Sequence, residues 1–388
     1  MEKKPNCLKG MENMYGISKI EKFIDESDSL CLEDTSGRVK IDKNKSKINI
    51  NELVSGIPIA LKGNLSDKGI FIADDYIYYS PEIKSMDTPM EIETNNANDN
   101  KNMILFISNL RIGNPNVDEG LSSIARSMII DFIQNNNLNS KFSEFSKKIK
   151  KIILVGCSAY VDQKIEELEK GSFLQMDEYK KKLNIIIENY TLLDKYLKIL
   201  SKYIHVDLVN SIEGNDGVYF PEYPNSPLLF LENQVNINAK TLNLVPNPYS
   251  FNIYSNQTKS QKHFLGTSGE NINTIMQYTS INEPMDAMEK TLEWGHLAPL
   301  APDTFRIYPY NKEDPLILNK IPDVYFISGK KSLNHKVIKL KSNNGNKDVV
   351  LLELPDFSYT FKGILYNIDN DNINEIDFSQ EIQFPKTN

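Results

Sequence analysis

Prolines crowd into one stretch of this chain and limit what that stretch can form. They stand at positions 299, 302, 309, 315 and 322, shortly after the only tryptophan, Trp294, and after His296. Each proline fixes φ and lacks a backbone hydrogen-bond donor, so regular helix or sheet is excluded where they cluster. We therefore predict that the segment from Phe264 to Gly329 is a long, specifically shaped loop between strands, and such loops often carry function.

The length and composition indicate a soluble chain of two domains. At 388 residues it exceeds one ordinary domain. Its net charge of −8 disfavours a protein that holds nucleic acid through phosphate contacts alone. Cys7, Cys31 and Cys157 are too few and too widely spaced for a disulfide framework or a metal finger, which predicts a reducing, intracellular compartment. No stretch approaches the roughly 20 apolar residues of a membrane span, and none is typical of a signal peptide, so we expect neither membrane insertion nor secretion.

The first 81 residues carry short alternating runs that are typical of a small β-domain. Residues 30–41 and residues 56–79 each predict a hairpin. Several short strands without a long helix predict a small closed barrel of the OB type, with a weakly marked first strand at 7–15. Residues 82–102 are polar and predict a linker. The barrel is either a packing module, which we favour, or a direct single-strand binder.

Residues 103–388 change to the rhythm of a layered α/β domain. Apolar runs at 103–107, 152–155 and 205–209 predict three strands, of which the first two are buried on both faces. Apolar residues spaced three and four apart predict two helices between them. These are Leu121, Ile124, Met128 and Phe132 in the first helix, and Leu183, Ile186, Ile187, Tyr190, Leu193, Leu197 and Leu200 in the second. Residues 349–354 and 361–368 predict a closing hairpin, so strands and helices are expected in layers.

Several polar residues have a structural interpretation beside a functional one. The sequence Gly266–Gly269 before a predicted helix lacks the lysine and the glycine spacing of a phosphate-binding loop, which favours a tight strand-to-helix turn. No constellation of carboxylates accompanies His296, so we interpret it as an anchor of the proline-rich loop. Cys157 has no candidate base beside it, and a buried structural thiol is favoured over a nucleophile.

Polar residues also follow the buried strands. Asn109 and Arg111 follow the first, Cys157 the second, and Asn215 the third. These positions resemble those of two-metal phosphoesterases similar to calcineurin. In that family the strand ends carry the motifs Asp-x-His, Gly-Asp-x-x-Asp, Gly-Asn-His and Gly-His-x-His. The chemistry requires them because two cations need carboxylates and imidazoles around a bridging oxygen. Here an amide, a guanidinium and a thiol replace the first ligands, Asn215 lacks the His that should follow it, and the last pair is absent at 327–330. Since an amide is a weak ligand and a guanidinium cannot ligate, the resemblance implies a phosphoesterase fold with no metal, no cofactor and no catalytic residue.

Short motifs spread over the chain extend this resemblance. They are Gly266-Thr267-Ser268-Gly269, His296 to Thr304, Tyr308-Pro309, Asp314-Pro315, Val324-Tyr325-Phe326, Val206 to Val209, Leu244 to Tyr249 and Leu354 to Ser358. The set resembles the B subunits of eukaryotic replicative DNA polymerases, and 301–304 with 314–315 favours the delta class. That family joins an OB fold to an inactive phosphoesterase-like domain. The resemblance therefore implies an OB-fold barrel over 1–81, a linker over 82–102, and an inactive calcineurin-like metallophosphoesterase domain with αββα layers over 103–388.

The resemblance also implies a function without catalysis, as a scaffold subunit of DNA polymerase delta in the nucleus. Its partners would be the C-terminal domain of the catalytic subunit of DNA polymerase delta and, in many lineages, a further accessory subunit, with DNA reached only through the complex and no membrane involved. Two alternatives stay open. An active metal-dependent phosphodiesterase is disfavoured by Asn109, Arg111 and Cys157, and an independent single-strand DNA-binding OB protein is disfavoured by the acidic balance.

Overall fold

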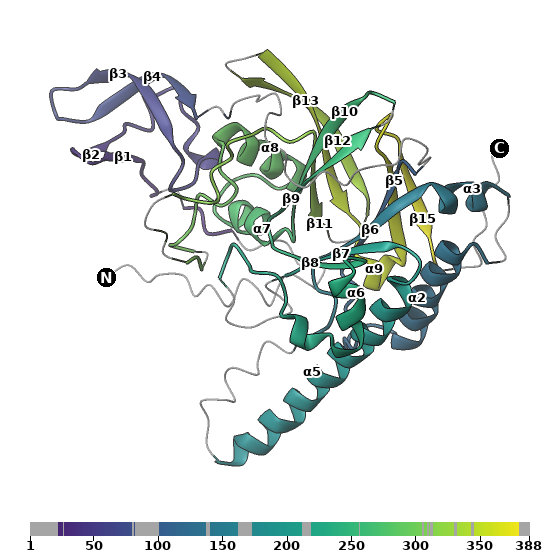
Figure 1. Ribbon diagram of the computed structural model, residues 1–388. Coiled ribbons are helices and arrows are strands. Elements are labelled where there is room, and N and C mark those ends of the chain that lie inside the picture. The colour runs from purple at the N-terminus through teal and green to yellow at the C-terminus, as the bar shows by residue number, and fades with distance from the viewer. Residues whose placement is uncertain are drawn as a thin grey trace. The chain divides into compact units, whose positions relative to one another are not determined.

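A computed structural model of the chain (Figure 1) describes residues 22–25, 27–79, 81, 101–136, 140–161, 173–211, 219–255, 257–304, 306–308, 310, 313–329, 332–342 and 345–379. The weakly marked strand at 7–15 and residues 82–100 of the predicted linker lie outside these ranges. The chain divides into two compact units. The N-terminal unit is Met1–Ser85, Glu270–Ile321 and Val337–Leu351, and the larger unit is Met86–Gly269, Pro322–Lys336 and Leu352–Asn388.

The N-terminal unit begins with two antiparallel β-hairpins, as the alternating runs predict. They pair β1 (Cys31–Asp34) with β2 (Gly37–Lys40), and β3 (Ile59–Leu65) with β4 (Phe71–Tyr78). Asp34 holds the first turn, because its Oδ1 accepts hydrogen bonds from the amides of Ser36 and Gly37 at 2.7 and 3.1 Å. A bridge between Ile41 and Phe71 joins the two hairpins. Closure of these strands into a barrel stays a prediction.

The remainder of this unit corrects the prediction that the segment 264–329 is a loop. Among its described residues, the helices are η1 (Ile50–Glu52), α7 (Glu270–Gln277) and α8 (Pro284–Trp294). A proline can start α8 because the first turn of a helix leaves that amide without an intrahelical partner. The helix ends where Gly295 adopts a φ of 66°. The loop that the prolines predict is therefore limited to residues 295–323.

The larger unit is built on a six-stranded sheet with the order β15-β14-β5-β6-β7-β8. Its strands are β5 (Met103–Ser108), β6 (Ile149–Val155), β7 (His205–Val209), β8 (Leu242–Val245), β14 (Lys362–Asn367) and β15 (Ile373–Asp377). β5 to β8 run parallel, and β14 pairs antiparallel with β5. Every residue of β5 is buried, as a parallel strand covered on both faces requires. The three strands predicted from apolar runs are confirmed.

Helices cover one face of this sheet (Figure 1). Ahead of β8, the described residues of the unit form the helical segments α2 (Glu119–Gln134), α3 (Ser140–Lys148), α5 (Phe173–Leu200), η3 (Pro227–Leu229), η4 (Leu231–Asn233) and α6 (Gln234–Asn238). Ala125, Ile129 and Phe132 of α2 and Leu193 and Leu197 of α5 pack onto the buried side chains of the strands. Within the described residues, no helix combines the length and the apolar character that crossing a membrane requires.

The two long helices lie where the apolar spacing predicts them, but only part of each predicted stripe is buried. In α2, Leu121 and Ile124 are 52% and 57% exposed, because the helix turns the side of Ala125 toward the sheet. In α5, Leu183 stays exposed and the stripe is buried from Leu193 onward. The first half of α5 projects beyond the sheet (Figure 1), so its apolar residues meet no core.

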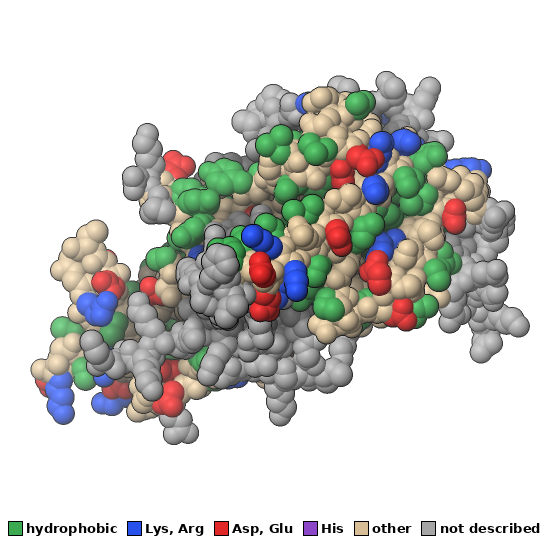
Figure 2. Space-filling model, turned by 90° about the horizontal axis from the view of Figure 1, so that it is seen from below, with side chains coloured by type: hydrophobic (Ala, Val, Ile, Leu, Met, Phe, Trp, Pro, Cys, Tyr) green, Lys and Arg blue, Asp and Glu red, His purple; other side chains and the backbone are tan. Residues whose placement is uncertain are grey.

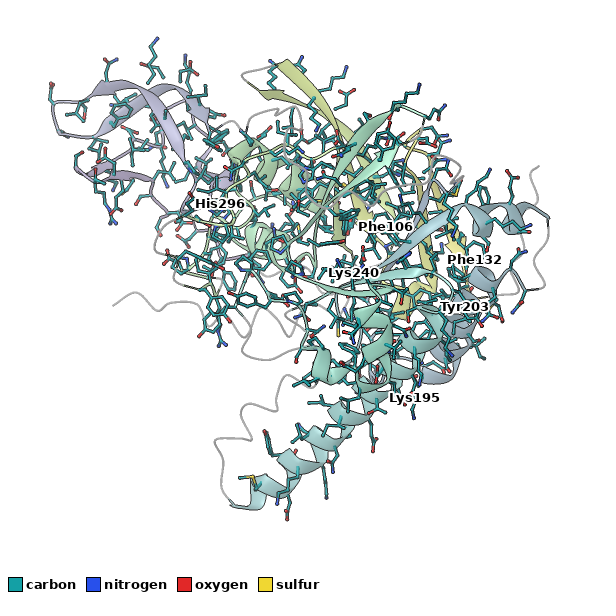
Figure 3. The ribbon with its side chains drawn as sticks, viewed as in Figure 1. Phe106, Phe132, Lys195, Tyr203, Lys240 and His296 are labelled. Carbon is teal, nitrogen blue, oxygen red and sulfur yellow. The ribbon has the colours of Figure 1, made fainter. Side chains whose placement is uncertain are left out.

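Within the larger unit, β10 and β11 of a second sheet pack on the other face of the six-stranded sheet. The order of this second sheet is β12-β13-β11-β10-β9. Its strands are β9 (Tyr249–Ser255), β10 (Ser260–Thr267), β11 (Val324–Ser328), β12 (Asn334–Ser342) and β13 (Gly345–Leu354). The ring centroids of Phe106 and Phe326 are 4.9 Å apart, and those of Phe264 and Tyr366 are 5.6 Å apart. Figure 3 labels Phe106 of β5 and Phe132 of α2, and Phe132 belongs to the core between the helices and the sheet.

The predicted closing hairpin of 349–354 with 361–368 is wrong, because β13 and β14 belong to different sheets. The short helix α9 (Phe357–Thr360) separates them. Asp356 caps this helix, and its Oδ1 accepts a hydrogen bond from the amide of Ser358 at 3.0 Å. The chain therefore passes from one sheet to the other through a capped turn, and a bridge to Ser108 brings Asp356 to the end of β5.

Candidate functional site at the ends of strands β5 and β6

Polar side chains gather where β5, β6 and β11 end in the larger unit. The carboxyl ends of parallel strands meet at one edge of a sheet, and ligand sites of open α/β sheets lie at that edge. Asn109 and Arg111 follow β5, Cys157 follows β6, and Ser328 ends β11. Asp356, the cap of α9, completes the group. Three of the four positions predicted from the sequence are thus close to one another.

The chain leaves these strands in backbone conformations that are rare for ordinary residues. Asn109 and Arg111 have φ angles of 55° and 45°, in the left-handed region. Gly156 has a φ of 80°, and a Cβ atom at this position would clash with Oδ1 of Asn109. Backbone pairing offsets the strain, since the amides of Asn109 and Arg111 donate to the carbonyls of Val155 and Cys157 at 2.8 and 3.0 Å.

The side chain of Asn109 bridges three neighbours. Its Oδ1 accepts a hydrogen bond from the amide of Cys157 at 3.0 Å. Its Nδ2 donates to Oγ of Ser328 at 3.0 Å and to Oδ2 of Asp356 at 3.2 Å. A carboxylate at position 109 would set an oxygen against Asp356 and repel it. The amide is therefore the side chain that this arrangement requires, and more than a weak substitute for an Asp ligand.

Arg111 and Asp356 form a buried ion pair. The distance from Nη2 to Oδ2 is 3.2 Å, and the two side chains are 5% and 4% exposed. Ser358 donates its amide and its hydroxyl to the other carboxylate oxygen at 3.0 and 2.6 Å. Burial raises the pKa of Asp356, while the Arg111 guanidinium and the Ser358 hydrogen bonds oppose that rise. The guanidinium thus supplies the positive charge that this buried carboxylate needs.

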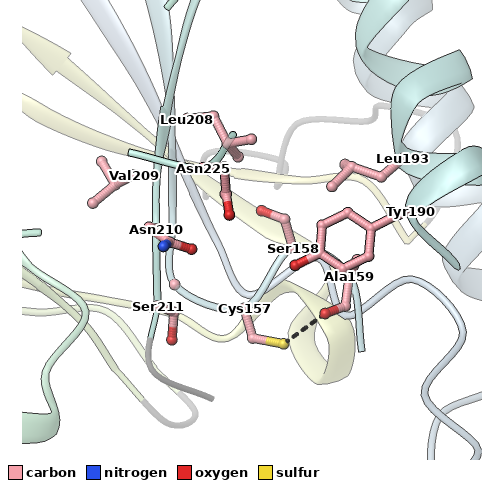
Figure 4. A pocket seen from close by; sticks show the side chains of 11 residues that line it. Cys157, Ser158, Ala159, Tyr190, Leu193, Leu208, Val209, Asn210, Ser211 and Asn225 are labelled. Atoms are coloured by element: carbon pink, nitrogen blue, oxygen red, sulfur yellow. Dashed lines mark hydrogen bonds between the residues drawn. The ribbon is translucent and has the colours of Figure 1, made fainter. Parts of the chain in front are cut away.

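Cys157 lies beside a cavity about as large as one water molecule, at the ends of β6 and β7 (Figure 4). The thiol is 2% exposed, and its Sγ donates to the carbonyl of Ala159 at 3.3 Å. Burial raises the pKa of Tyr190, whose ring lines the same cavity. Among the described residues that line it, none is acidic, basic or a histidine.

Asn215, the fourth predicted position, lies outside the described residues. Across the ranges that the structure describes, no three His, Cys, Asp or Glu side chains come together in a group that could hold a metal. Beside Asn109 and Arg111, both oxygens of Asp356 already accept hydrogen bonds or pair with the guanidinium. A guanidinium stays protonated and cannot act as a ligand. The donors at these strand ends are suited to internal hydrogen bonding.

Sequence reasoning assigned no role to two members of this group. The signal for Asp356 is the sequence Pro-Asp-Phe-Ser after a buried strand, because an aspartate followed two residues later by serine is typical of a helix cap. Ser328 has no local signal. Its contact with Asn109 spans 219 residues of chain and depends on how the two sheets pack.

In the N-terminal unit, His296 anchors the proline-rich loop, as the sequence predicts. Its Nδ1 accepts a hydrogen bond from the amide of Ala298 at 3.1 Å, which leaves Nε2 to donate to Oδ2 of Asp314 at 3.0 Å. The amide of Leu297 donates to the carbonyl of Leu316 at 2.9 Å and closes the loop. The His296 side chain is 8% exposed, so these contacts are structural.

Comparison with known proteins shows which family has a sequence similar to that of this chain. The family model described as the B subunit of DNA polymerase alpha/epsilon matches residues 104–334, which is more than half of the chain. The chain belongs to this family. A second family model, described as the DNA polymerase delta subunit OB-fold domain, matches residues 1–76 of this chain. The match supports the OB fold predicted for the first 81 residues.

Relatives of this B-subunit family member match it over most of its length. The DNA polymerase delta small subunit of Arabidopsis thaliana is 26% identical over 387 residues, which cover 98% of this chain and 80% of the relative. The protein of the same name from Saccharomyces cerevisiae is 27% identical, and the match covers 95% of this chain and 75% of that relative. DNA polymerase delta subunit 2 of Drosophila melanogaster is 22% identical, and the match covers 94% of this chain and 76% of that relative. The predicted resemblance to polymerase B subunits, and to the delta class, is confirmed.

Proposed function

We propose that this chain is an accessory subunit of the DNA polymerase delta complex that binds the C-terminal domain of the catalytic subunit and supports DNA replication in the nucleus. Relatives named as delta small subunits match almost the full chain. The order of the two family matches, an OB-fold domain and then a B-subunit region, supports the same assignment. A further accessory subunit is an additional partner, and DNA is reached through the complex.

The Arg111–Asp356 ion pair carries the proposal that this subunit is not catalytic. Two-metal phosphoester cleavage needs carboxylates and imidazoles around its cations. At the ends of β5 and β6 the chain presents an amide, a guanidinium and a thiol, and the adjacent carboxylate is paired with the guanidinium. Asn109, Arg111, Cys157 and Asn215 are then degenerate ligand positions in an inactive phosphoesterase-like domain over 103–388. A linker over 82–102 joins that domain to the barrel over 1–81.

Co-expression tests the proposed assembly. The full chain is produced with the catalytic chain of DNA polymerase delta from the same organism, and in parallel with a version of that chain that lacks its C-terminal domain. Co-elution in size-exclusion chromatography is expected with the intact catalytic chain only. Recovery of the accessory chain by itself in both preparations would contradict the proposal.

Hydrolysis by the purified chain tests the enzymatic alternative. The rate of bis(p-nitrophenyl) phosphate cleavage is measured with added Mn²⁺, and no rate above that of the buffer is expected. A manganese-dependent rate that is lost in the Asp356→Asn variant would show that the site is active.

Oligonucleotide binding by the same preparation tests the second alternative. The barrel of a direct single-strand binder would give tight binding that weakens steeply with salt. We expect the acidic chain to bind a labelled single strand weakly at physiological salt.

A further inference from the structure

One part of the larger unit presents hydrophobic side chains to the solvent. η3, η4 and α6 place Leu228, Leu231 and Val235 outward, with 77%, 70% and 78% of their surface exposed. They lie close together along the chain, in three consecutive short helical segments. These three residues are the outward ridge. Apolar side chains that gather on a surface mark protein interaction sites, whereas scattered ones do not.

Buried contacts hold the base of the outward ridge against α5. Phe230, which lies between the ridge residues, is fully buried, and its ring centroid is 6.4 Å from that of Tyr190. Asp194 of α5 accepts hydrogen bonds from the amide of Glu232 at 2.8 Å and from Nδ2 of Asn233 at 2.6 Å. Because this base is already ordered, a partner that docks on the ridge loses little affinity to ordering it.

Lysines at the C-terminal end of α5 form a basic strip beside the outward ridge. Lys195 and Lys198 lie in α5, Lys202 lies in the turn that follows its end at Leu200, and Figure 3 labels Lys195. Nζ of Lys198 pairs with Oε2 of Glu232 at 3.0 Å and so links the strip to η4. Lys198 and, more weakly, Lys195 lower the pKa of Glu232. Because Glu232 pairs with Lys198 alone, Lys195 and Lys202 leave this strip positive on a chain whose net charge is −8.

Further apolar residues border the basic strip on α5. Leu192 and Ile199 are 49% and 43% exposed, and their spacing of seven residues places them on one side of the helix. α5 lies at the lower edge of Figure 1, and Figure 2 views the molecule from that side, where hydrophobic side chains lie exposed among basic and acidic ones. The surface therefore combines two apolar borders with a positive strip between them.

We propose that the outward ridge and the basic strip together bind an amphipathic helix of a partner protein, whose apolar side chains lie on the ridge and whose acidic side chains face Lys195 and Lys202. Helices recognised in this way use anchors at i, i+3, i+4 and i+7. Charges at the rim of such a site select the partner and its orientation. The positive strip favours an acidic helix over a basic one. None of these residues belongs to the Arg111–Asp356 group.

Two matched peptides of about 18 residues, five helical turns, test this surface. Both carry leucines on one face, and the flanking positions hold glutamates in the acidic peptide and lysines in the basic one. Fluorescence anisotropy with the full chain is expected to show at least tenfold tighter binding of the acidic peptide. The double variant Leu231→Asp, Val235→Asp should lose at least tenfold, and Lys195→Glu, Lys202→Glu should reverse the preference. Val337→Asp, at a 61% exposed position of β12, is the matched control and should bind as the unaltered chain does.

Equal binding of the two peptides, binding that the ridge variant leaves unchanged, or no binding of either peptide would overturn the proposal. Light scattering examines a second copy of the chain as the occupant. A dimer that dissociates in the Leu231→Asp variant would assign the ridge to self-association and would also overturn it. Circular dichroism establishes that each variant folds. The catalytic chain is absent from these measurements, so their outcome is independent of the co-expression experiment.

Discussion

Arg111 and Asp356 form an ion pair that is almost completely buried, with side chains 5% and 4% exposed. A carboxylate buried without a partner costs several kcal/mol, and so does a guanidinium. Asn109 and Ser358 donate further hydrogen bonds to the same carboxylate. Each member of the group is therefore required by the others, which gives the amide and the guanidinium at these strand ends a structural role.

Replacing Arg111 by methionine is expected to reduce the free energy of unfolding by about 3–5 kcal/mol at neutral pH, because Asp356 would stay buried without its counterion. Urea denaturation measures the change. The double variant Arg111→Met, Asp356→Asn is the control, and it should recover part of the loss because the amide carries no charge and can still cap α9. Equal losses in the single and double variants would show that the ion pair does not matter.

The loss in the Arg111→Met variant should depend on pH. Without the guanidinium, the pKa of Asp356 in the folded state rises further above its ordinary value of 3.8. A carboxyl whose pKa is higher in the folded state binds its proton more tightly there, so stability falls as pH rises from about 4 through the folded pKa. The variant is expected to differ from the unaltered chain less at pH 4 than at pH 7.5. A difference that is constant over this range would contradict the prediction.

Gly156→Ala is expected to destabilise the larger unit by about 2–5 kcal/mol, because alanine adds backbone strain at a φ of 80° and its Cβ displaces Asn109. Gly69→Ala is the matched control. Its φ is 73°, but no atom lies within 4 Å of the added Cβ, so only the strain of about 1–2 kcal/mol is expected. Thermal unfolding of both variants measures the difference, and equal losses would show that packing on Asn109 contributes nothing.

At the scale of elements, the proline-rich loop depends on a few hydrogen bonds. The amides of Leu297 and Leu318 pair with the carbonyls of Leu316 and Gly295 at 2.9 and 2.8 Å. His296 braces the same segment through Ala298 and Asp314. The loop is thus a closed structure that the histidine stabilises from inside.

His296→Ala is expected to open this loop. It removes two hydrogen bonds, each of about 1 kcal/mol, so exchange of the amide hydrogens of Leu297 and Leu318 should accelerate about tenfold or more. Hydrogen–deuterium exchange with mass spectrometry measures the rates. His335→Ala, at an exposed position of β12, should leave them unchanged. Unaltered exchange in His296→Ala would contradict the anchoring role.

Elements also show where apolar spacing succeeds and fails. It located α2 and α5, because residues spaced three and four apart are a local signal of a helix. It predicted the buried side of α2 only in part. Leu121 and Ile124 belong to the apolar stripe and are exposed, since the rotation of α2 about its axis is set by the sheet beneath it. On α5, the exposed residues Leu192 and Ile199 lie outside the predicted stripe and border the basic strip.

For the whole molecule, the division into units differs from the order of the chain. Residues 270–321 belong to the same compact unit as the N-terminal hairpins. The amide of Ser280 donates to the carbonyl of Asn51 at 2.7 Å, and the ring centroids of Phe23 and Tyr278 are 5.2 Å apart. A Cβ at Gly56 would strike the carbonyl of Pro299. The proline-rich segment therefore has its packing partners near the start of the chain.

A fragment that begins at residue 101 is expected to fold poorly, because residues 270–321 would expose surface that the N-terminal residues cover. Its melting temperature should fall by several degrees, since each 1 kcal/mol shifts that of a domain this large by about 2–4 °C. Circular dichroism against the full chain measures the shift, and size-exclusion chromatography detects aggregation. A monomeric fragment that melts with the full chain would show that the two parts are independent.

The sequence alone determined the local features: the strands at 103–107, 152–155 and 205–209, the two hairpins, the long helices α2 and α5, and the polar residues Asn109, Arg111 and Cys157 after the buried strands. Runs, spacings and residue types within a few positions encode these. Only the tertiary structure decided which side chains surround Asn109. Ser328 and Asp356 reach Asn109 from 219 and 247 residues away along the chain. Contacts over such separations arise from the pairing and packing of sheets, because the partners that bury a charge are set by the whole fold.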